Sequence, residues 1–192
     1  TLAKCGLSTI SALEGARRLS YLDLRGNTLR NLEPLASMPK LQELYLQHNA
    51  VTALNALSQL EQLNKLDISY NSVSNLSPLA TCTSLAWLNA GNNMISDLAG
   101  MEQFTALTHL YLDHNSLIEV KPLRKLTGLV ELNLSNNQLV YIDDLASLTK
   151  LEKFYCAHNE LVHLPQWPKG MPLTTIDVSH NTIGSLSVLS GM

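Results

Sequence analysis

Apolar residues recur along the chain with a period of 22 residues. In each unit they stand at positions 1, 4 and 6, and again at positions 11, 14, 17 and 20. Between the first group, as in the stretch ELYLQ at residues 43–47, polar and apolar residues alternate, which predicts a short strand with one buried face. The later apolar residues recur every three positions. This spacing predicts a tight return of the 3₁₀ type rather than a long helix.

One polar residue keeps the same register as the leucines. Position 9 of eight successive units is an asparagine, namely Asn27, Asn49, Asn71, Asn93, Asn115, Asn137, Asn159 and Asn181. An amide side chain can both donate to and accept from the backbone of the turn after a strand, so we predict a structural role for all eight. Extrapolated backwards, the same slot falls on Cys5, so Thr1 begins inside a ninth, truncated unit.

A single unit of this kind cannot bury its own leucines. Neighbouring units must therefore stack and share one continuous core, with their strands side by side and parallel. Nine strands at the usual spacing predict a sheet roughly 40 Å across. Position 16 is proline in three units, at Pro34, Pro78 and Pro122, which suits the first turn of a short helical piece and prevents a long one.

The pattern L-x-x-L-x-L-x-x-N-x-L resembles the leucine-rich repeat, and it covers all 192 residues as a single array whose terminal units are both incomplete. Units with NLEPLASMPKL or NLSPLATCTSL after the asparagine resemble the internalins of bacterial surfaces, and also the phosphatase-regulator class of the same repeat. The resemblance implies an α/β fold. It would be a right-handed solenoid with a parallel β-sheet on the concave face and short 3₁₀ or irregular returns on the convex face.

The positions that vary between units carry the functional signal. Positions 3, 5 and 7 of each strand should project onto the concave sheet, with position 8 at its rim. These columns hold five of the six tyrosines and five of the six histidines. Tyrosine and tryptophan carry much of the binding energy at protein interfaces, although aromatic residues also favour strands for packing alone. The predicted partner-binding residues are Tyr21, Asp23, Tyr45, His48, Asp67, Tyr70, Trp87, Asn89, Tyr111, Asp113, His114 and Tyr155.

Charged residues in the same columns divide into two groups. Opposite charges one strand apart should form weak structural pairs, namely Glu43 with Lys65 and Glu131 with Lys153. Four carboxylates lack so obvious a partner, namely Asp23, Asp67, Asp113 and Asp177. The concave face is therefore expected to be aromatic and mildly acidic. Such a face would suit a partner with neutral polar or basic side chains.

Signatures of other function classes are absent from the sequence. There is no H-E-x-x-H, G-x-x-x-x-G-K-[ST], C-x-x-C or G-x-S-x-G motif, so we expect no enzyme, no metal and no cofactor. His158 and His180 are column neighbours, but a zinc site needs three or four protein ligands. The net charge of −3 and the scattered basic residues argue against nucleic acid. No apolar run approaches the ~20 residues that span a membrane.

The remaining features concern packing and the ends of the array. Cys5, Cys82 and Cys156 all fall at interior slots in distant units, so we predict three free, buried thiols. The stretch LPQWPKGMPL at residues 164–173 replaces the usual return and predicts a reshaped convex surface. Neither TLAKCGL nor GSLSVLSGM resembles a polar cap, which suggests a longer natural protein.

These observations favour a monomeric array that binds another protein on its concave sheet. The internalin resemblance implies a secreted or bacterial cell-surface protein that contacts a host or partner protein, and we favour that location over the cytoplasm. The regulator resemblance implies instead an intracellular subunit that binds an enzyme such as a phosphatase. A third hypothesis is a rigid spacer for another domain. The two resemblances differ in the location that they imply, and the spacer hypothesis alone predicts that concave substitutions have no effect.

Overall fold

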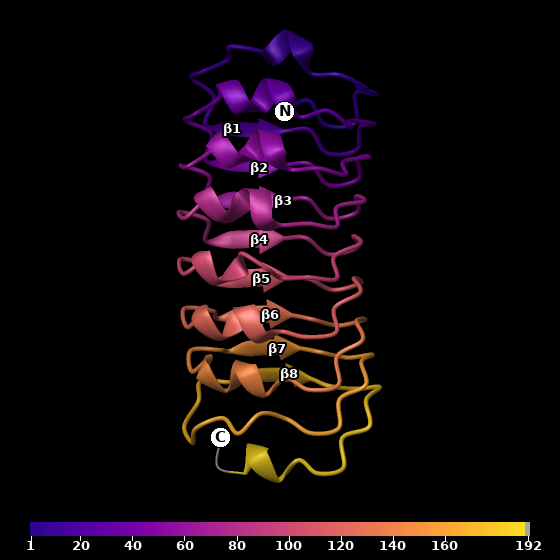
Figure 1. The fold of residues 1–192 in the computed structure, drawn as a ribbon, viewed down its shortest axis with the longest axis vertical. Helices are drawn as coiled ribbons and strands as arrows, with labels where there is room; N and C mark the ends of the chain where they lie inside the picture. Colours follow the sequence, from indigo (N-terminus) through magenta and orange to yellow (C-terminus); the bar gives the residue numbers. More distant parts are fainter. Residues whose placement is uncertain (191–192) are drawn as a thin grey trace.

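The computed structural model describes residues 1–190, and the last two residues of the predicted array lie outside that range. Eight short parallel strands form one sheet in sequence order (Figure 1). They are β1 (Tyr21–Asp23), β2 (Glu43–Tyr45), β3 (Lys65–Asp67), β4 (Trp87–Asn89), β5 (His109–Tyr111), β6 (Glu131–Asn133), β7 (Lys153–Tyr155) and β8 (Thr175–Asp177). Each residue pairs with the residue 22 positions later, as in Tyr21 opposite Glu43.

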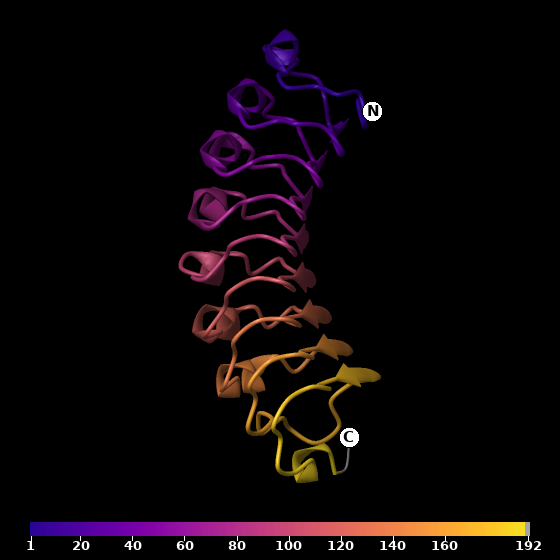
Figure 2. The same cartoon turned by 90° about the vertical axis from the view of Figure 1, so that its right-hand side faces the viewer.

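Short 3₁₀ helices form the returns. They are η1 (Ser11–Leu13), η2 (Glu33–Ser37), η3 (Asn55–Gln59), η4 (Ser77–Thr81), η5 (Met101–Gln103), η6 (Lys121–Lys125), η7 (Asp143–Ser147) and η8 (Ser187–Leu189). Six of them lie between successive strands from β1 to β7, η1 precedes β1 and η8 follows β8. Proline occupies the first turn of η2, η4 and η6, as the sequence predicted. In the side view the stack bends so that the strands line its concave edge and the helices its convex edge (Figure 2).

The repeated leucines form one continuous core between the sheet and the helices. In the central units nearly every one of them is completely buried, as at Leu44, Leu66, Leu88 and Leu110. Burial of a leucine side chain contributes roughly 1.5–3 kcal/mol, so this row is the main source of stability. The fold prediction is therefore correct: the chain is a leucine-rich-repeat solenoid with a parallel sheet and 3₁₀ returns.

The asparagines at position 9 connect adjacent units. In a typical case, the Asn137 amide donates to the carbonyls of Leu134 (2.9 Å) and Leu112 (3.0 Å), and its oxygen accepts from the Leu117 amide at 2.9 Å. Three backbone groups from two units are satisfied by one side chain. Because such groups would be costly to bury without partners, the asparagines hold the register of the stack.

The first unit differs from the prediction in two respects. It supplies backbone bonds beside β1, from the Leu2 amide to the Asp23 carbonyl and from the Lys4 amide to that of Arg25, yet it forms no ninth strand among the described residues. Cys82 and Cys156 are fully buried, and burial raises the pKa of these thiols to about 11 and about 12 respectively. The predicted burial of Cys5 is wrong: this thiol is exposed because no described unit packs outside it.

The unusual return between β7 and β8 is filled by a tryptophan. No helix forms there, although every residue between the two strands is described. The Trp167 ring packs edge-on against Phe154 with 5.5 Å between centroids, and its indole Nε1 donates to the Leu145 carbonyl at 3.0 Å. The sequence prediction of a reshaped convex surface is confirmed, since Trp167 takes the place of the missing helix in covering the core.

Candidate protein-binding surface

We define the concave surface as positions 3, 5, 7 and 8 of the repeats. Tyr21 and Tyr70 are about half exposed, at 46% and 51%, and His48 and His114 are also exposed. Four further aromatic residues are half-buried, namely Tyr45, Trp87, Tyr111 and Tyr155. The structure therefore places all the predicted aromatic and histidine residues where a partner could reach them.

Rings on neighbouring strands contact one another across the first five strands. Tyr21 and Tyr45 are 5.5 Å apart between centroids, and Trp87 and Tyr111 are 5.4 Å apart. The Lys65 ammonium on β3 bridges the two pairs, at 5.5 Å from the Tyr45 ring and 4.8 Å from the Trp87 ring. These packed contacts restrict the movement of the rings. Tyr155 lies apart from this row on β7.

One of the two expected charge pairs is present. The Lys153 ammonium lies 3.1 Å from the Glu131 carboxylate, so that prediction is confirmed. The predicted pairing of Glu43 with Lys65 is wrong. Glu43 instead accepts a hydrogen bond from the Tyr45 hydroxyl at 2.9 Å, while Lys65 turns toward the rings. Burial and this carboxylate together raise the pKa of Tyr45 to about 12.

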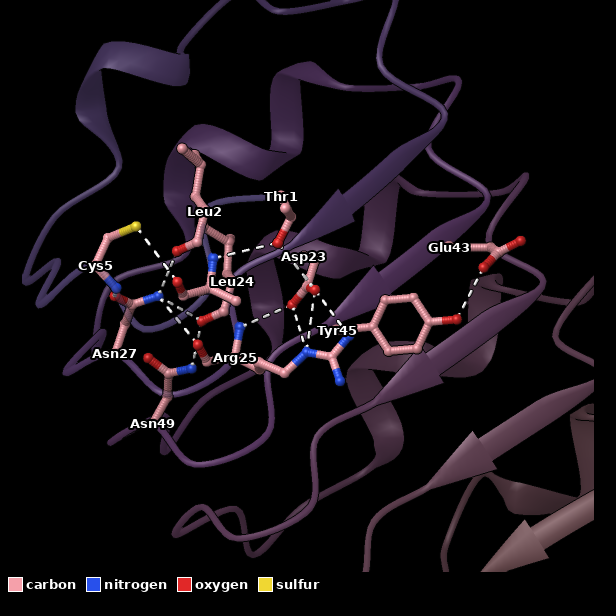
Figure 3. A network of polar contacts seen from close by, with 11 residues as sticks. Thr1, Leu2, Cys5, Asp23, Leu24, Arg25, Asn27, Glu43, Tyr45 and Asn49 are labelled. Atoms are coloured by element: carbon pink, nitrogen blue, oxygen red, sulfur yellow. Dashed lines mark hydrogen bonds and ion pairs between the residues drawn. The ribbon is translucent and has the colours of Figure 1, made fainter.

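Asp23 is not the free carboxylate that its column suggested. Its side chain is buried and lies 2.8 Å from Nη2 of Arg25, which also donates through Nε (Figure 3). The Thr1 hydroxyl donates to the same carboxylate at 3.0 Å. Arg25 in turn lies over the Tyr45 ring, 5.5 Å from its centroid. The hydrogen bond from Arg25 is the main reason that the pKa of Asp23 is lowered.

Position 5 also has a structural role that sequence reasoning missed. Where it is Asp or Asn, its oxygen accepts the backbone amide two residues later, for example from Ser69 to Asp67 at 3.0 Å and from Gly91 to Asn89 at 3.0 Å. Asp67 is buried and also accepts from the Ser69 hydroxyl at 2.7 Å. Asp and Asn are the residues that form such turns. The signal was available, because position 5 of the full units is Asp, Asn or Tyr throughout.

Asp113 is placed differently, because it stands at position 7. Its carboxylate extends toward Gly91 of the preceding unit, where a Cβ atom would lie only 2.8 Å from Oδ1. The Asn133 amide donates to the same oxygen at 3.2 Å. Among residues 1–190 no cationic side chain forms an ion pair with Asp113. Burial raises the pKa of this carboxyl, against smaller opposing effects of its own backbone amide and His114.

Position 8 adopts left-handed backbone in every unit. His48, Tyr70 and His114 have φ values of 55°, 54° and 52°. Asparagine and histidine tolerate this conformation better than most residues, which explains their frequency in the column. The His48 and Tyr70 rings stack at 4.3 Å. The turn therefore points these rings outward along the rim of the sheet.

Two histidines near the end of the sheet also stack. The His158 and His180 rings lie 4.0 Å apart and are nearly parallel. Within the described part of the chain, no group of three or more potential ligands could hold a metal ion.

None of the helices that the structure describes has the length and apolar character needed to cross a bilayer.

Comparison with known proteins agrees with this architecture. Family models match residues 17–73 (leucine rich repeat), 127–169 (leucine rich repeats, two copies) and 171–189 (leucine rich repeat). A search of curated protein sequences finds no match.

Solved structures similar to the chain include two internalins from Listeria monocytogenes. InlF superposes with a TM-score of 0.86 at 26% identity, covering 97% of this chain and 62% of that one. Internalin C2 gives 0.83 at 26% identity, covering 95% and 80%. A leucine-rich repeat protein of Leptospira interrogans gives 0.87 at 25% identity, covering 95% of this chain and 48% of that one. The chain thus spans only part of these proteins, and it is an internalin-like leucine-rich repeat protein.

Proposed function

We propose that the concave surface binds a protein partner, and that the chain acts as a secreted or cell-surface recognition module. The observation that carries this proposal is the row of ring side chains at Tyr21, Tyr45, Trp87 and Tyr111, which folding does not require on an open sheet. Aromatic residues held in place lose little freedom on binding, so more of their contact energy appears as affinity. Leucine-rich repeats generally serve protein interaction, and the internalin resemblance favours a partner outside the cell.

The test compares two triple variants for capture of proteins. Tyr45→Ala, Tyr111→Ala and Tyr155→Ala together remove aromatic area from the concave surface. The matched control removes exposed apolar side chains elsewhere, with Ile118→Ala, Tyr141→Ala and Val162→Ala, which are 64%, 61% and 41% exposed. Each immobilised array is incubated with solubilised surface proteins of host cells and, separately, with cytosolic extract. Retained proteins are quantified by mass spectrometry.

We expect the concave variant to retain at least about tenfold less partner protein than wild type, because hot-spot aromatic residues each contribute on the order of 2 kcal/mol to binding. The control variant should retain the capture, and thermal unfolding should show both variants folded. Enrichment from the surface fraction would support an extracellular partner, whereas enrichment from cytosol alone would favour the regulator hypothesis. Equal capture by wild type and the concave variant would refute the proposal and leave a spacer role.

A further inference from the structure

Asp113 is one of several carboxylates on the concave surface that form no ion pair among the described residues, and unlike Asp67 and Asp177 it does not accept the backbone amide two residues later. Asp113 lies partly buried on the continuation of β5, and Gly91 beside it has no side chain to cover it. A residue with a Cβ at position 91 would approach Oδ1 to 2.8 Å and Oδ2 to 3.1 Å. The carboxylate therefore packs directly on Gly91, and we call its outward, partly exposed side, beside Gly91 and Asn133, the acidic notch. It lies near the middle of the eight-stranded sheet.

The notch is bounded by groups that suit a flat cation. Asn133 fixes the carboxylate through its 3.2 Å hydrogen bond. Tyr111 precedes Asp113 by two residues on the same face of the sheet, about 7 Å away, and its ring contacts that of Trp87. Aromatic faces attract cations, most strongly where water is displaced. A carboxylate and two rings therefore converge on one part of the surface.

The chain itself shows how such a site is filled. At the first strand, Arg25 places its guanidinium on the Asp23 carboxylate at 2.8 Å and over the Tyr45 ring at 5.5 Å. On β3, Lys65 lies 4.8 Å from the Trp87 ring. At the first strand, Arg25 of the chain itself thus contacts both a carboxylate and a ring. At the notch, no cationic side chain among the described residues forms an ion pair with the carboxylate.

We propose that the protein partner places a basic side chain, with arginine the better fit, on the Asp113 carboxylate at the acidic notch. This inference rests on the proposed function and names the chemistry that the concave surface recognises. The planar guanidinium can bond a carboxylate with two donors while its face lies on an aromatic ring. A partly buried carboxylate without a cation is unfavourable in the free protein, so pairing in the complex recovers what burial costs.

A direct test uses Nα-acetyl-arginine methylamide as the probe and the citrulline analogue, which lacks the charge, as its control. Binding is followed by ¹H–¹⁵N NMR at the Gly91 amide, the Asn133 side-chain amide and the Trp87 indole. We expect saturable shifts with the arginine probe in the millimolar range, and binding at least about tenfold weaker for citrulline. Asp113→Asn should abolish the shifts, whereas Asp97→Asn, an equal charge change at an exposed position off the concave surface, should preserve them.

A second variant tests the shape of the notch. Gly91→Ala retains the carboxylate but places a Cβ against it, so we expect binding of the arginine probe to weaken about fivefold or more. Unfolding curves must show each variant folded. If the arginine and citrulline probes shift the same resonances equally, or if Asp113→Asn changes nothing, the inference is overturned. That result would leave the proposed function intact wherever capture still depends on the concave tyrosines.

Discussion

Two aspartates on the same surface have opposite surroundings. Asp23, at the first strand, is buried against Arg25 and accepts hydrogen bonds from four donors, namely the backbone amide, Nε and Nη2 of Arg25 and the Thr1 hydroxyl. Asp113, at the middle of the sheet, receives a side-chain hydrogen bond only from Asn133 among the described residues. The pKa of Asp23 is lowered by its partner, while burial raises the pKa of Asp113. The fold gives the first carboxylate an ion pair and the second only a neutral hydrogen-bond donor.

The difference shows that the number of carboxylates on a surface does not give the number that are free to bind another molecule. A carboxylate at position 5 can accept the amide two residues later and is thereby used by its own strand, as Asp67 is. Asp113, at position 7, does not accept the amide two residues later, and its side-chain donor, Asn133, lies on the neighbouring strand. Asp113 therefore keeps carboxylate lone pairs that another molecule could bind, whereas Asp67 uses part of its own within its strand. The position in the repeat accounts for this difference.

The largest expected effect comes from removing the scaffold beneath each aspartate. Asn115→Ala would leave the Ile95 amide without a partner and would remove one of the two asparagine donors to each of the carbonyls of Ala90 and Leu112. An unsatisfied buried polar group costs about 1–3 kcal/mol and each lost hydrogen bond about 1 kcal/mol, so we expect a loss of about 3 kcal/mol in the free energy of unfolding. Asn27→Ala, under Asp23, should cost less because it borders the outermost unit. Urea unfolding measures both, and equal losses would contradict this ranking.

Substitution of the two aspartates should change stability in opposite directions. Asp23→Asn removes a charge-assisted bond to Arg25, whose side chain is 42% exposed, so we expect a loss of about 1 kcal/mol. Asp113→Asn removes an uncompensated charge and keeps an acceptor for Asn133, so we expect no loss or a small gain. Urea midpoints of the two variants against wild type decide the matter. If Asp113→Asn destabilises the protein as much as Asp23→Asn does, the fold already compensates the charge of the Asp113 carboxylate, which contradicts the inference.

Much of the scaffold follows from the sequence because one rule repeats. A period of 22, alternation around position 5 and the asparagine at position 9 determine strands, returns and core, and the structure agrees in every full unit except residues 151–172, where the return forms no helix. Side-chain partners do not follow in the same way. Lys65 has the Glu43 carboxylate and two rings within reach, and its position in the repeat alone does not choose among them. The structure places it on the rings.

The misjudged residues share a cause. Arg25 lies two residues after Asp23, the last residue of β1, and the two side chains meet on the same face, but the columns of the repeat predict pairs only between neighbouring strands. The slot of Cys5 in the repeat predicts an interior thiol, but the outermost unit has no described neighbour to cover it. In both cases the repeat pattern describes an average unit. Local sequence separation and the end of the stack then determine the outcome.

The dependence of stability on pH should separate the aspartates further. The lowered pKa of Asp23 means that its contribution is present above its unfolded-state pKa and is lost as the pH falls. The raised pKa of Asp113 means the reverse: its contribution is present in acid and is lost as the pH rises through the folded-state value. Unfolding of wild type and each variant between about pH 3 and 7 should give difference curves of opposite slope. Parallel curves would contradict the assignment.

The smallest expected effect concerns Lys65, the cation that lies between the two regions. Lys65→Met should reduce stability by about 0.5 kcal/mol, the usual size of a cation–ring contact at an exposed site. It should also increase quenching of Trp87 fluorescence by acrylamide, because the side chain lies 4.8 Å over that ring while Trp167 is buried. Lys153→Met is the matched control, since Lys153 pairs with Glu131 instead. Equal quenching in both variants would show that Lys65 does not shield the ring in solution. Arg25 would then be the remaining example, within the described residues, of a cation that lies on a concave ring.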